Sequence, residues 1–123
     1  MRALIVDDSR AMRMILAGVL GEMGFETLEA EHGEQALEQL EANPSIDLAL
    51  VDWNMPKMNG LELIRAVRKR PKFRKLCIVV VTSESEQSHI LRAMTAGATE
   101  YMSKPFEKQS MIDKLTFLGF GAV

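Results

Sequence analysis

Short apolar runs alternate along the chain with longer segments of mixed polarity. Residues 46–51 and 76–81 are almost continuously apolar, which is typical of strands buried on both faces of a sheet. Residues 2–6 form a similar run, residues 25–30 are interrupted by two acids, and residues 100–102 are short. We predict a strand at each of the five runs. The polar interruptions in 25–30 favour a position at the edge of the sheet.

The segments between these runs have the spacing of amphipathic helices, with apolar residues three and four positions apart. In the first segment, Asp8 or Ser9 is the expected N-cap and Gly24 the expected stop. The apolar stripe of this helix consists of Met12, Ile15, Leu16, Val19, Leu20 and Met23. The predicted helices are residues 9–24, 33–42, 61–69, 84–97 and a last one that begins near Glu107.

This alternation of strands and helices predicts an α/β fold with a parallel sheet and helices on both faces. Right-handed crossovers restrict the topology to a doubly wound sheet. In such a sheet, the carboxyl ends of all strands lie along one edge, where open α/β proteins bind their ligands. We expect residues 1–123 to form one domain, since this length is typical of one.

Composition narrows the classes of function. The net charge of −2 predicts no nucleic-acid partner and no anionic membrane surface. No stretch approaches the length of a membrane span, and no signal peptide is visible. The single cysteine, Cys77, cannot form an internal disulfide and lies in an apolar run. We therefore expect a buried thiol in a cytoplasmic protein.

The predicted strands end in residues whose side chains can do chemistry together. Asp7 and Asp8 end the first strand, Asp52 ends the third, Thr82 ends the fourth, and the fifth leads to Lys104. Taken singly, each has an ordinary structural alternative, such as a helix cap, a turn or a solvated lysine. A common accident at four strand ends is improbable, so we interpret the five residues as one site.

The chemistry that these groups support is phosphoryl transfer. Three carboxylates in one crevice raise one another's pKa, and a hard divalent cation such as Mg²⁺ relieves the repulsion. An aspartate can then attack phosphorus and form an acyl phosphate. Lys104 can supply an ammonium group and Thr82 a hydroxyl to the transferred group.

The same residues carry a resemblance to a known family. The chain resembles the receiver domain of bacterial two-component response regulators, and most closely the stand-alone chemotaxis regulators of the CheY type. This resemblance implies a flavodoxin-like sheet of five parallel strands in the order 2-1-3-4-5, with five helices and no output domain. The matching motifs are Asp7-Asp8, Val51-Asp52-Trp53-Asn54-Met55-Pro56 with Gly60-Leu61-Glu62-Leu63, Val81-Thr82, and Tyr101 with Lys104-Pro105-Phe106.

The resemblance also implies a role for each site residue. Asp52 is the expected phospho-acceptor. Asp7, Asp8, Asp52 and the backbone carbonyl of Asn54 are the expected Mg²⁺ ligands. Thr82 and Lys104 are expected to contact the phosphoryl group. The protein would catalyse its own phosphorylation and dephosphorylation without being an enzyme of the usual kind.

Three further expectations concern switching and signal lifetime. Tyr101 is the expected aromatic switch, which turns inward when Thr82 moves. Asn54 and Glu84 occupy the two positions that are expected to tune the dephosphorylation rate. The bond between Lys104 and Pro105 is expected to be cis.

The implied partners are a histidine kinase and a downstream target, with a flagellar motor switch favoured, or a phosphatase. A single-domain phosphorelay carrier and a non-phosphorylated adaptor remain alternatives. A phosphatase of the haloacid-dehalogenase type and a flavin carrier fit less well, because the residues after the first strand lack the D-x-D pattern and the Ser/Thr/Gly-rich loop. We expect a monomer, and we assign no role to His32 or His89.

The C-terminal segment departs from the family pattern. Phe117 and Phe120 fall off the apolar stripe of the last predicted helix. They either pack on the end of the helix or fray, or they form an exposed partner or dimer surface. The candidate partner surface comprises Ile90, Tyr101, Phe117 and Phe120.

Overall fold

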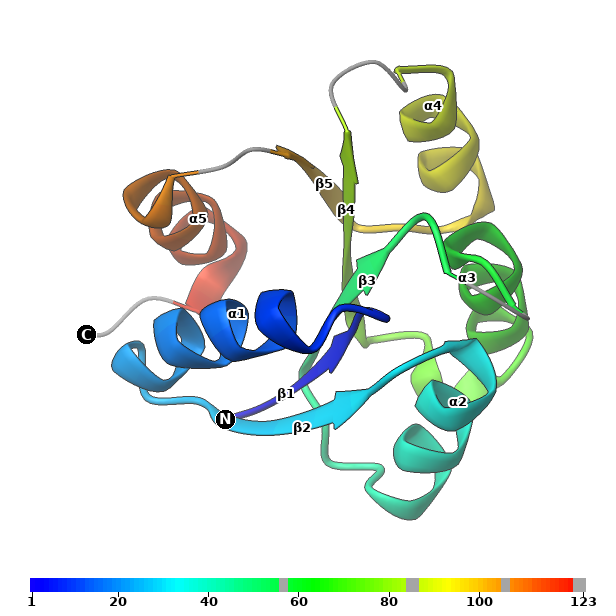
Figure 1. Ribbon diagram of the computed structural model, residues 1–123. Coiled ribbons are helices and arrows are strands. Elements are labelled where there is room, and N and C mark those ends of the chain that lie inside the picture. Colours follow the sequence, from blue (N-terminus) through cyan, green and yellow to red (C-terminus); the bar gives the residue numbers. More distant parts are fainter. Residues whose placement is uncertain (56–57, 84–86, 105–106, 121–123) are drawn as a thin grey trace.

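The computed structural model describes residues 1–55, 58–83, 87–104 and 107–120, in which strands and helices alternate (Figure 1). No helix in this part of the chain is long and apolar enough to cross a membrane. The elements are β1 (Arg2–Val6), α1 (Arg10–Glu22), β2 (Glu26–Ala30), α2 (Gly33–Ala42), β3 (Leu48–Asp52), α3 (Gly60–Arg68), the 3₁₀ turn η1 (Pro71–Phe73), β4 (Cys77–Ser83), α4 (Gln87–Ala96), β5 (Glu100–Lys104), α5 (Lys108–Leu115) and the terminal turn η2 (Thr116–Phe120).

The five strands form one parallel sheet in the order β2-β1-β3-β4-β5. Helices α1 and α5 cover one face, and α2, α3 and α4 cover the other (Figure 1). The predicted α/β fold, its strand order and the edge position of β2 are confirmed. The order places β1 and β3 side by side, so the polar residues that follow them are neighbours at the carboxyl edge.

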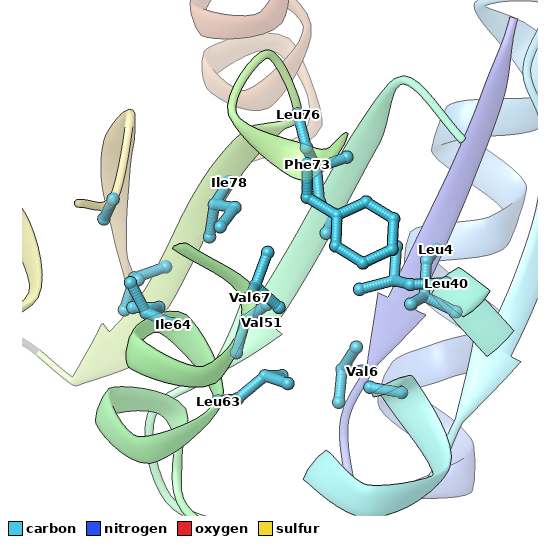
Figure 2. Packing of buried hydrophobic residues seen from close by; sticks show 14 of the residues in the cluster. Leu4, Val6, Leu40, Val51, Leu63, Ile64, Val67, Phe73, Leu76 and Ile78 are labelled. Atoms are coloured by element: carbon cyan, nitrogen blue, oxygen red, sulfur yellow. The ribbon is translucent and has the colours of Figure 1, made fainter. Parts of the chain in front are cut away.

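Alternation along the central strands divides the core into two clusters. In β1, Leu4 and Val6 face the α2–α4 side, whereas Ala3 and Ile5 face α1 and α5. Figure 2 shows the first cluster, in which the ring of Phe73 closes the sheet end near Leu40. All five residues of β3 are buried, as the continuous apolar run predicts. The site therefore lies at the end of a fully buried strand.

Several local predictions were wrong. Ile15 is 56% exposed, because the buried stripe of α1 is narrower than predicted and consists of Leu16, Val19 and Leu20 together with Arg13. Cys77 is half-buried rather than buried, because it begins β4 beside a surface groove. β5 reaches Lys104, two residues beyond the predicted end, because its pairing with β4 continues to Ser83.

The two C-terminal phenylalanines behave differently. Phe117 is 85% exposed, whereas Phe120 packs against Phe25 with 5.6 Å between ring centroids. Gly119 between them has a φ of 102°, a left-handed conformation that glycine adopts at no steric cost. The kink at Gly119 turns Phe120 back onto the domain, where it packs against Phe25, whereas Phe117 stays exposed.

Candidate functional site

Three carboxylates converge at the carboxyl edge of the sheet. Asp7 follows β1 and is 2% exposed, Asp52 ends β3 and is 6% exposed, and Asp8 is exposed. One oxygen from each lies within 4.8 Å of the others. The predicted convergence of these acids is therefore observed.

The backbone around Asp7 is fixed from several sides. Its N–H donates to the carbonyl of Ala30 at 3.1 Å, which continues the pairing of β1 with β2. Its Oδ1 accepts the N–H of Ser9 at 2.8 Å, and its carbonyl accepts the buried guanidinium of Arg13 at 2.7 Å. Ser9, not Asp8, is the N-cap of α1, because its side chain accepts the N–H of Met12. Asp8 is therefore left free of a capping role.

The loop after β3 returns closely to the strand that it leaves. The N–H of Trp53 donates to Val81 at 3.1 Å, and the N–H of Gly60 donates to the carbonyl of Trp53 at 3.0 Å. A Cβ on Gly60 would lie 2.9 Å from the Cα of Trp53 and 3.0 Å from the carbonyl oxygen of Asp52. Glycine is thus needed for α3 to begin against the backbone of Asp52.

Lys104 and Thr82 reach the same edge through the pairing of β4 with β5. The Lys104 ammonium lies 3.4 Å from Oδ1 of Asp52 and 3.7 Å from Oδ2 of Asp7. Thr82 is 1% exposed and pairs with Ser103, one residue before Lys104. Lys104 therefore bridges two of the three acids, and the hydroxyl-bearing side chain of Thr82 lies one strand away from Asp52.

The electrostatics of the site resist ionisation of Asp52. Its pKa is raised from 3.8 to about 6, first by burial and then by the charge of Asp7. The ammonium of Lys104 and the N–H of Asn54, which donates to Oδ1 at 3.3 Å, lower the pKa but do not reverse the shift. Three carboxylates thus meet a single ammonium among the described groups, and the site has an excess of negative charge.

The donor set fits a hard divalent cation. Carboxylate oxygens are the ligands that Mg²⁺ prefers, and it uses few of them while keeping several waters. Asp7, Asp8 and Asp52 each offer one oxygen within a span that a single ion can bridge. The unfavourable ionisation of Asp52 is the charge imbalance that such an ion would neutralise.

Tyr101 has a partner that the sequence pattern did not reveal. Its side chain is half-buried on edge strand β5. The Lys114 ammonium donates to its carbonyl at 2.6 Å and lies 4.7 Å from the centroid of its ring. Lys114 is half-buried on α5, but the sequence gives no signal for this contact, since a solvated lysine would look the same.

His89, to which we assigned no role, contacts Trp53, the residue next to Asp52. Its ring stacks on that of Trp53, with 4.7 Å between centroids and 19° between planes. This contact joins α4 directly to the loop after Asp52. Of the other predicted residues, Ile90 is half-buried on α4, and Glu84 and Pro105 lie outside the described residues.

A doubly wound sheet with clustered acids at the carboxyl ends of β1 and β3 is the architecture of receiver domains. Residues 3–116 match the family described as the response regulator receiver domain. The chain belongs to this family, and it is a two-component response regulator.

Named relatives and solved structures agree with this assignment. The chain is 42% identical over 116 residues to chemotaxis protein CheY1 of Helicobacter pylori, covering 94% of each chain. The chemotaxis response regulator CheY4 of Vibrio cholerae matches with a TM-score of 0.88 and 29% identity, over 95% of this chain and 97% of that one. A two-component response regulator/GGDEF domain protein matches with a TM-score of 0.90 and 31% identity, over 95% of this chain but only 48% of the longer one. The chain thus spans about half of that solved protein.

Proposed function

We propose that the protein is a phosphorylation-activated switch, in which Asp52 accepts a phosphoryl group from a phosphohistidine of a histidine kinase. The observation that carries the proposal is the meeting of Asp52 with Asp7, Asp8 and the Lys104 ammonium at one edge of the sheet. Structural acids at strand ends do not require this convergence, whereas phosphoryl transfer does.

The proposed reaction makes one bond and breaks another. An ionised oxygen of Asp52 attacks phosphorus, the P–N bond breaks, and the imidazole leaves with the electron pair. A Mg²⁺ ion held by Asp7, Asp8, Asp52 and the carbonyl of Asn54 would neutralise charge on the phosphoryl oxygens. With a pKa of about 6, Asp52 is mostly ionised at neutral pH and can act as the nucleophile. Water later attacks phosphorus and releases inorganic phosphate.

Lys104 and Thr82 are proposed to hold the transferred group. The Lys104 ammonium already contacts Asp52 and would follow the added charge of roughly −1.5 to −2. Thr82 would move toward the phosphoryl oxygens, since a hydroxyl can donate to them. The side chain of Asn54 is exposed beside Asp52, where we propose that it sets the phosphoryl lifetime together with Glu84.

Tyr101 is proposed to report this movement to partners. The space that Thr82 vacates would accept the ring, which must leave the Lys114 ammonium. A cation–π contact contributes from about 0.5–1 kcal/mol at an exposed site to about 2 kcal/mol when desolvated, so this half-buried contact is weak enough to be broken by a switch. Replacing Tyr101 with Ala should abolish phosphorylation-dependent partner binding while leaving Asp52 phosphorylation intact.

We place this switch in chemotaxis, with the flagellar motor switch as its target, because relatives of nearly equal length carry chemotaxis names. The domain would act as a cytoplasmic monomer that binds other proteins. A single-domain phosphorelay carrier is the nearest alternative. Capture of a flagellar switch protein by the phosphorylated form, but not by the unphosphorylated form, would separate the two.

The experiment on the acceptor itself is direct. The protein is incubated with Mg²⁺ and a phosphorylated histidine kinase, and the modified residue is mapped by mass spectrometry after reduction of the acyl phosphate. We expect one phosphoryl group on Asp52, and none on Asp52→Asn. Phosphorylation of another residue, or none in the presence of several kinases and small phosphodonors, would contradict the proposal and favour an adaptor.

A further inference from the structure

Positive charge is concentrated in one segment far from the acidic site. Residues 65–75 hold seven of the fifteen lysines and arginines and no acid. The remaining chain holds all seventeen acids and eight basic residues. The small net charge therefore hides a strong separation of charge, and this basic segment has a field that differs from that of the whole molecule.

The basic segment borders a groove at the amino-terminal edge of the sheet. The groove has a volume of about 600 Å³ and lies where β3 and β4 begin, between the α3–β4 connection and the turn η2. Four cationic side chains and one carboxylate, Asp47, line it together with apolar residues. The cations are Arg68, Lys72, Arg74 and Lys75, and the apolar residues include Phe73, Leu76, Leu118 and Phe120.

The four cations differ in how far the fold already uses them. Arg68 is occupied, because it donates to the carbonyls of Phe73, Leu76 and Gly97, each at 2.8 Å. Lys72 pairs with Glu41 of α2, which also pairs with Arg70 at 3.1 Å.

Arg74 and Lys75 are exposed, and their side chains make no hydrogen bond or ion pair with any described residue. Arg68 therefore forms part of the groove wall, and Lys72 is already paired with Glu41. Arg74 and Lys75 are available to a ligand.

We propose that this groove binds an acidic segment of a partner protein, with carboxylates on Arg74 and Lys75 and an apolar side chain near Phe120. The mixed lining of the groove fits such a segment. The apolar lining residues would contact apolar side chains of the segment, and the lining cations would pair with its carboxylates. Charge complementarity decides the occupant. A nucleic acid or an anionic membrane extends beyond the groove and meets the acidic remainder of the chain, whereas a short segment stays within about one Debye length, roughly 10 Å, of the cations.

The location predicts that this binding is independent of phosphorylation. The groove lies at the amino ends of β3 and β4, and Asp52 lies at the opposite end of β3. A partner bound here would keep the switch nearby without competing for the phosphorylated edge. It would thereby raise the effective concentration for a second, phosphorylation-dependent contact.

The test uses a fluorescent peptide in which glutamates alternate with leucine and phenylalanine, titrated with the full chain at low salt. We expect saturable binding that weakens with salt and is the same for wild type and Asp52→Asn. Arg74→Gln/Lys75→Gln should weaken it about five- to tenfold, given the modest strength of two exposed charge pairs. The matched control, Arg65→Gln/Lys69→Gln, removes the same charge from exposed residues of the same segment that do not line the groove, and should change affinity less than twofold.

A second variant tests the pairing within the groove. Glu41→Gln frees Lys72 and Arg70 and should tighten peptide binding about twofold to threefold. Equal losses in both double variants would mean unspecific charge attraction, and equal binding of the glutamine version of the peptide would remove the charge argument. Tighter, Arg74-dependent binding of an oligonucleotide or of phosphatidylserine vesicles would replace the proposed occupant. Any of these results would overturn the proposal, and thermal midpoints would show that the variants are folded.

Discussion

Two charged residues at opposite ends of the sheet, Asp52 and Arg68, are treated differently by the fold. The Arg68 guanidinium donates three hydrogen bonds of 2.8 Å to backbone carbonyls. Among the described residues, Asp52 has only longer contacts, at 3.3 Å to the N–H of Asn54 and 3.4 Å to Lys104. Asp52 also faces the like charge of Asp7, which contributes to its raised pKa.

The difference separates a structural charge from a functional one. Burial lowers the pKa of Arg68, but its hydrogen bonds to the three carbonyls join α3 to the α3–β4 and α4–β5 connections. Asp52, which faces Asp7 and has only the ammonium of Lys104 nearby among the described cationic groups, is poorly compensated unless a further cation binds. A buried charge with satisfied hydrogen bonds supports the fold, whereas one held near like charges is available for a ligand.

The largest expected effect is at Arg68. Arg68→Met keeps much of the apolar stem but removes the three donors, so three carbonyls lose their partners. We expect the free energy of unfolding to fall by about 3 kcal/mol, since hydrogen bonds to charged groups contribute about 1.5–3 kcal/mol each and are not additive. Urea denaturation would measure this. The control Arg65→Met, three residues earlier and exposed, should change stability by less than about 0.5 kcal/mol. Equal losses of stability in Arg68→Met and Arg65→Met would contradict the structural role of the Arg68 charge.

Asp52→Asn should instead increase the free energy of unfolding. Because the pKa of Asp52 is raised to about 6, the folded state binds its proton more tightly than the unfolded state does. The contribution of this group to stability is complete below about pH 4 and is lost as the pH rises through 6. Without Mg²⁺, the Asn variant should be more stable than wild type by about 1–2 kcal/mol at pH 7.5, below the full value of the shift because solvent screens the edge.

The pH dependence provides the control for that prediction. The stability advantage of Asp52→Asn should shrink as the pH falls from 7 to 4.5 in denaturation curves. The exposed Asp113→Asn should show no such trend. A destabilised Asn variant at pH 7.5 would mean that the ionised carboxylate is well compensated by Lys104, and the comparison with Arg68 would fail.

Mg²⁺ should partly compensate the charge of Asp52 and so reduce its difference from the well-compensated Arg68. At about ten times its dissociation constant, a ligand that binds only the folded state stabilises it by about 1.4 kcal/mol. For wild type at pH 7.5 we expect a stabilisation of this size, measured as a rise in the thermal midpoint. Below pH 6 we expect little rise, because protons compete with Mg²⁺ for Asp52. Asp8→Asn should lose most of it, and Glu38→Gln, another exposed acid, should retain it. An equal response in both variants would place the ion elsewhere.

The smallest expected effect is at His89, which supports the loop beside Asp52. Aromatic pairs contribute about 0.5–1.5 kcal/mol beyond their buried area, and alanine recovers part of this in a helix. His89→Ala should therefore lower stability by less than about 1 kcal/mol, while shifting the emission of Trp53. Unchanged emission would show that the stacked geometry is not maintained in solution.

The sequence predicts the fold well because the central strands have no polar face to confuse the pattern. Continuous apolar runs located β3 and β4, and their polar ends located Asp52 and Thr82. The weaker predictions came where a side chain's surroundings depend on tertiary packing. Ile15 satisfies the helical stripe of α1, yet α5 and the sheet cover only part of that stripe.

The contacts that the sequence missed are made by residues whose type suggests solvent exposure. Arg68 looks like one basic residue among seven, and only the loops that fold around it give it acceptors. Lys114 and His89 gain their roles from partners far away in the chain, Tyr101 and Trp53. The basic segment can be read directly from the sequence. The overall net charge gives no sign of it, because the acids elsewhere in the chain cancel its contribution.

The most direct test of the central claim uses Trp53, the only tryptophan and the neighbour of Asp52. Its fluorescence would be followed on adding Mg²⁺ and then a small phosphodonor, in wild type and in Asp52→Asn. We predict a change with Mg²⁺, followed by a donor-dependent change that reverses as the acyl phosphate hydrolyses and that is absent from the Asn variant. A donor response that persists in Asp52→Asn, or no response of wild type to either addition, would contradict the account of Asp52 as the phospho-acceptor.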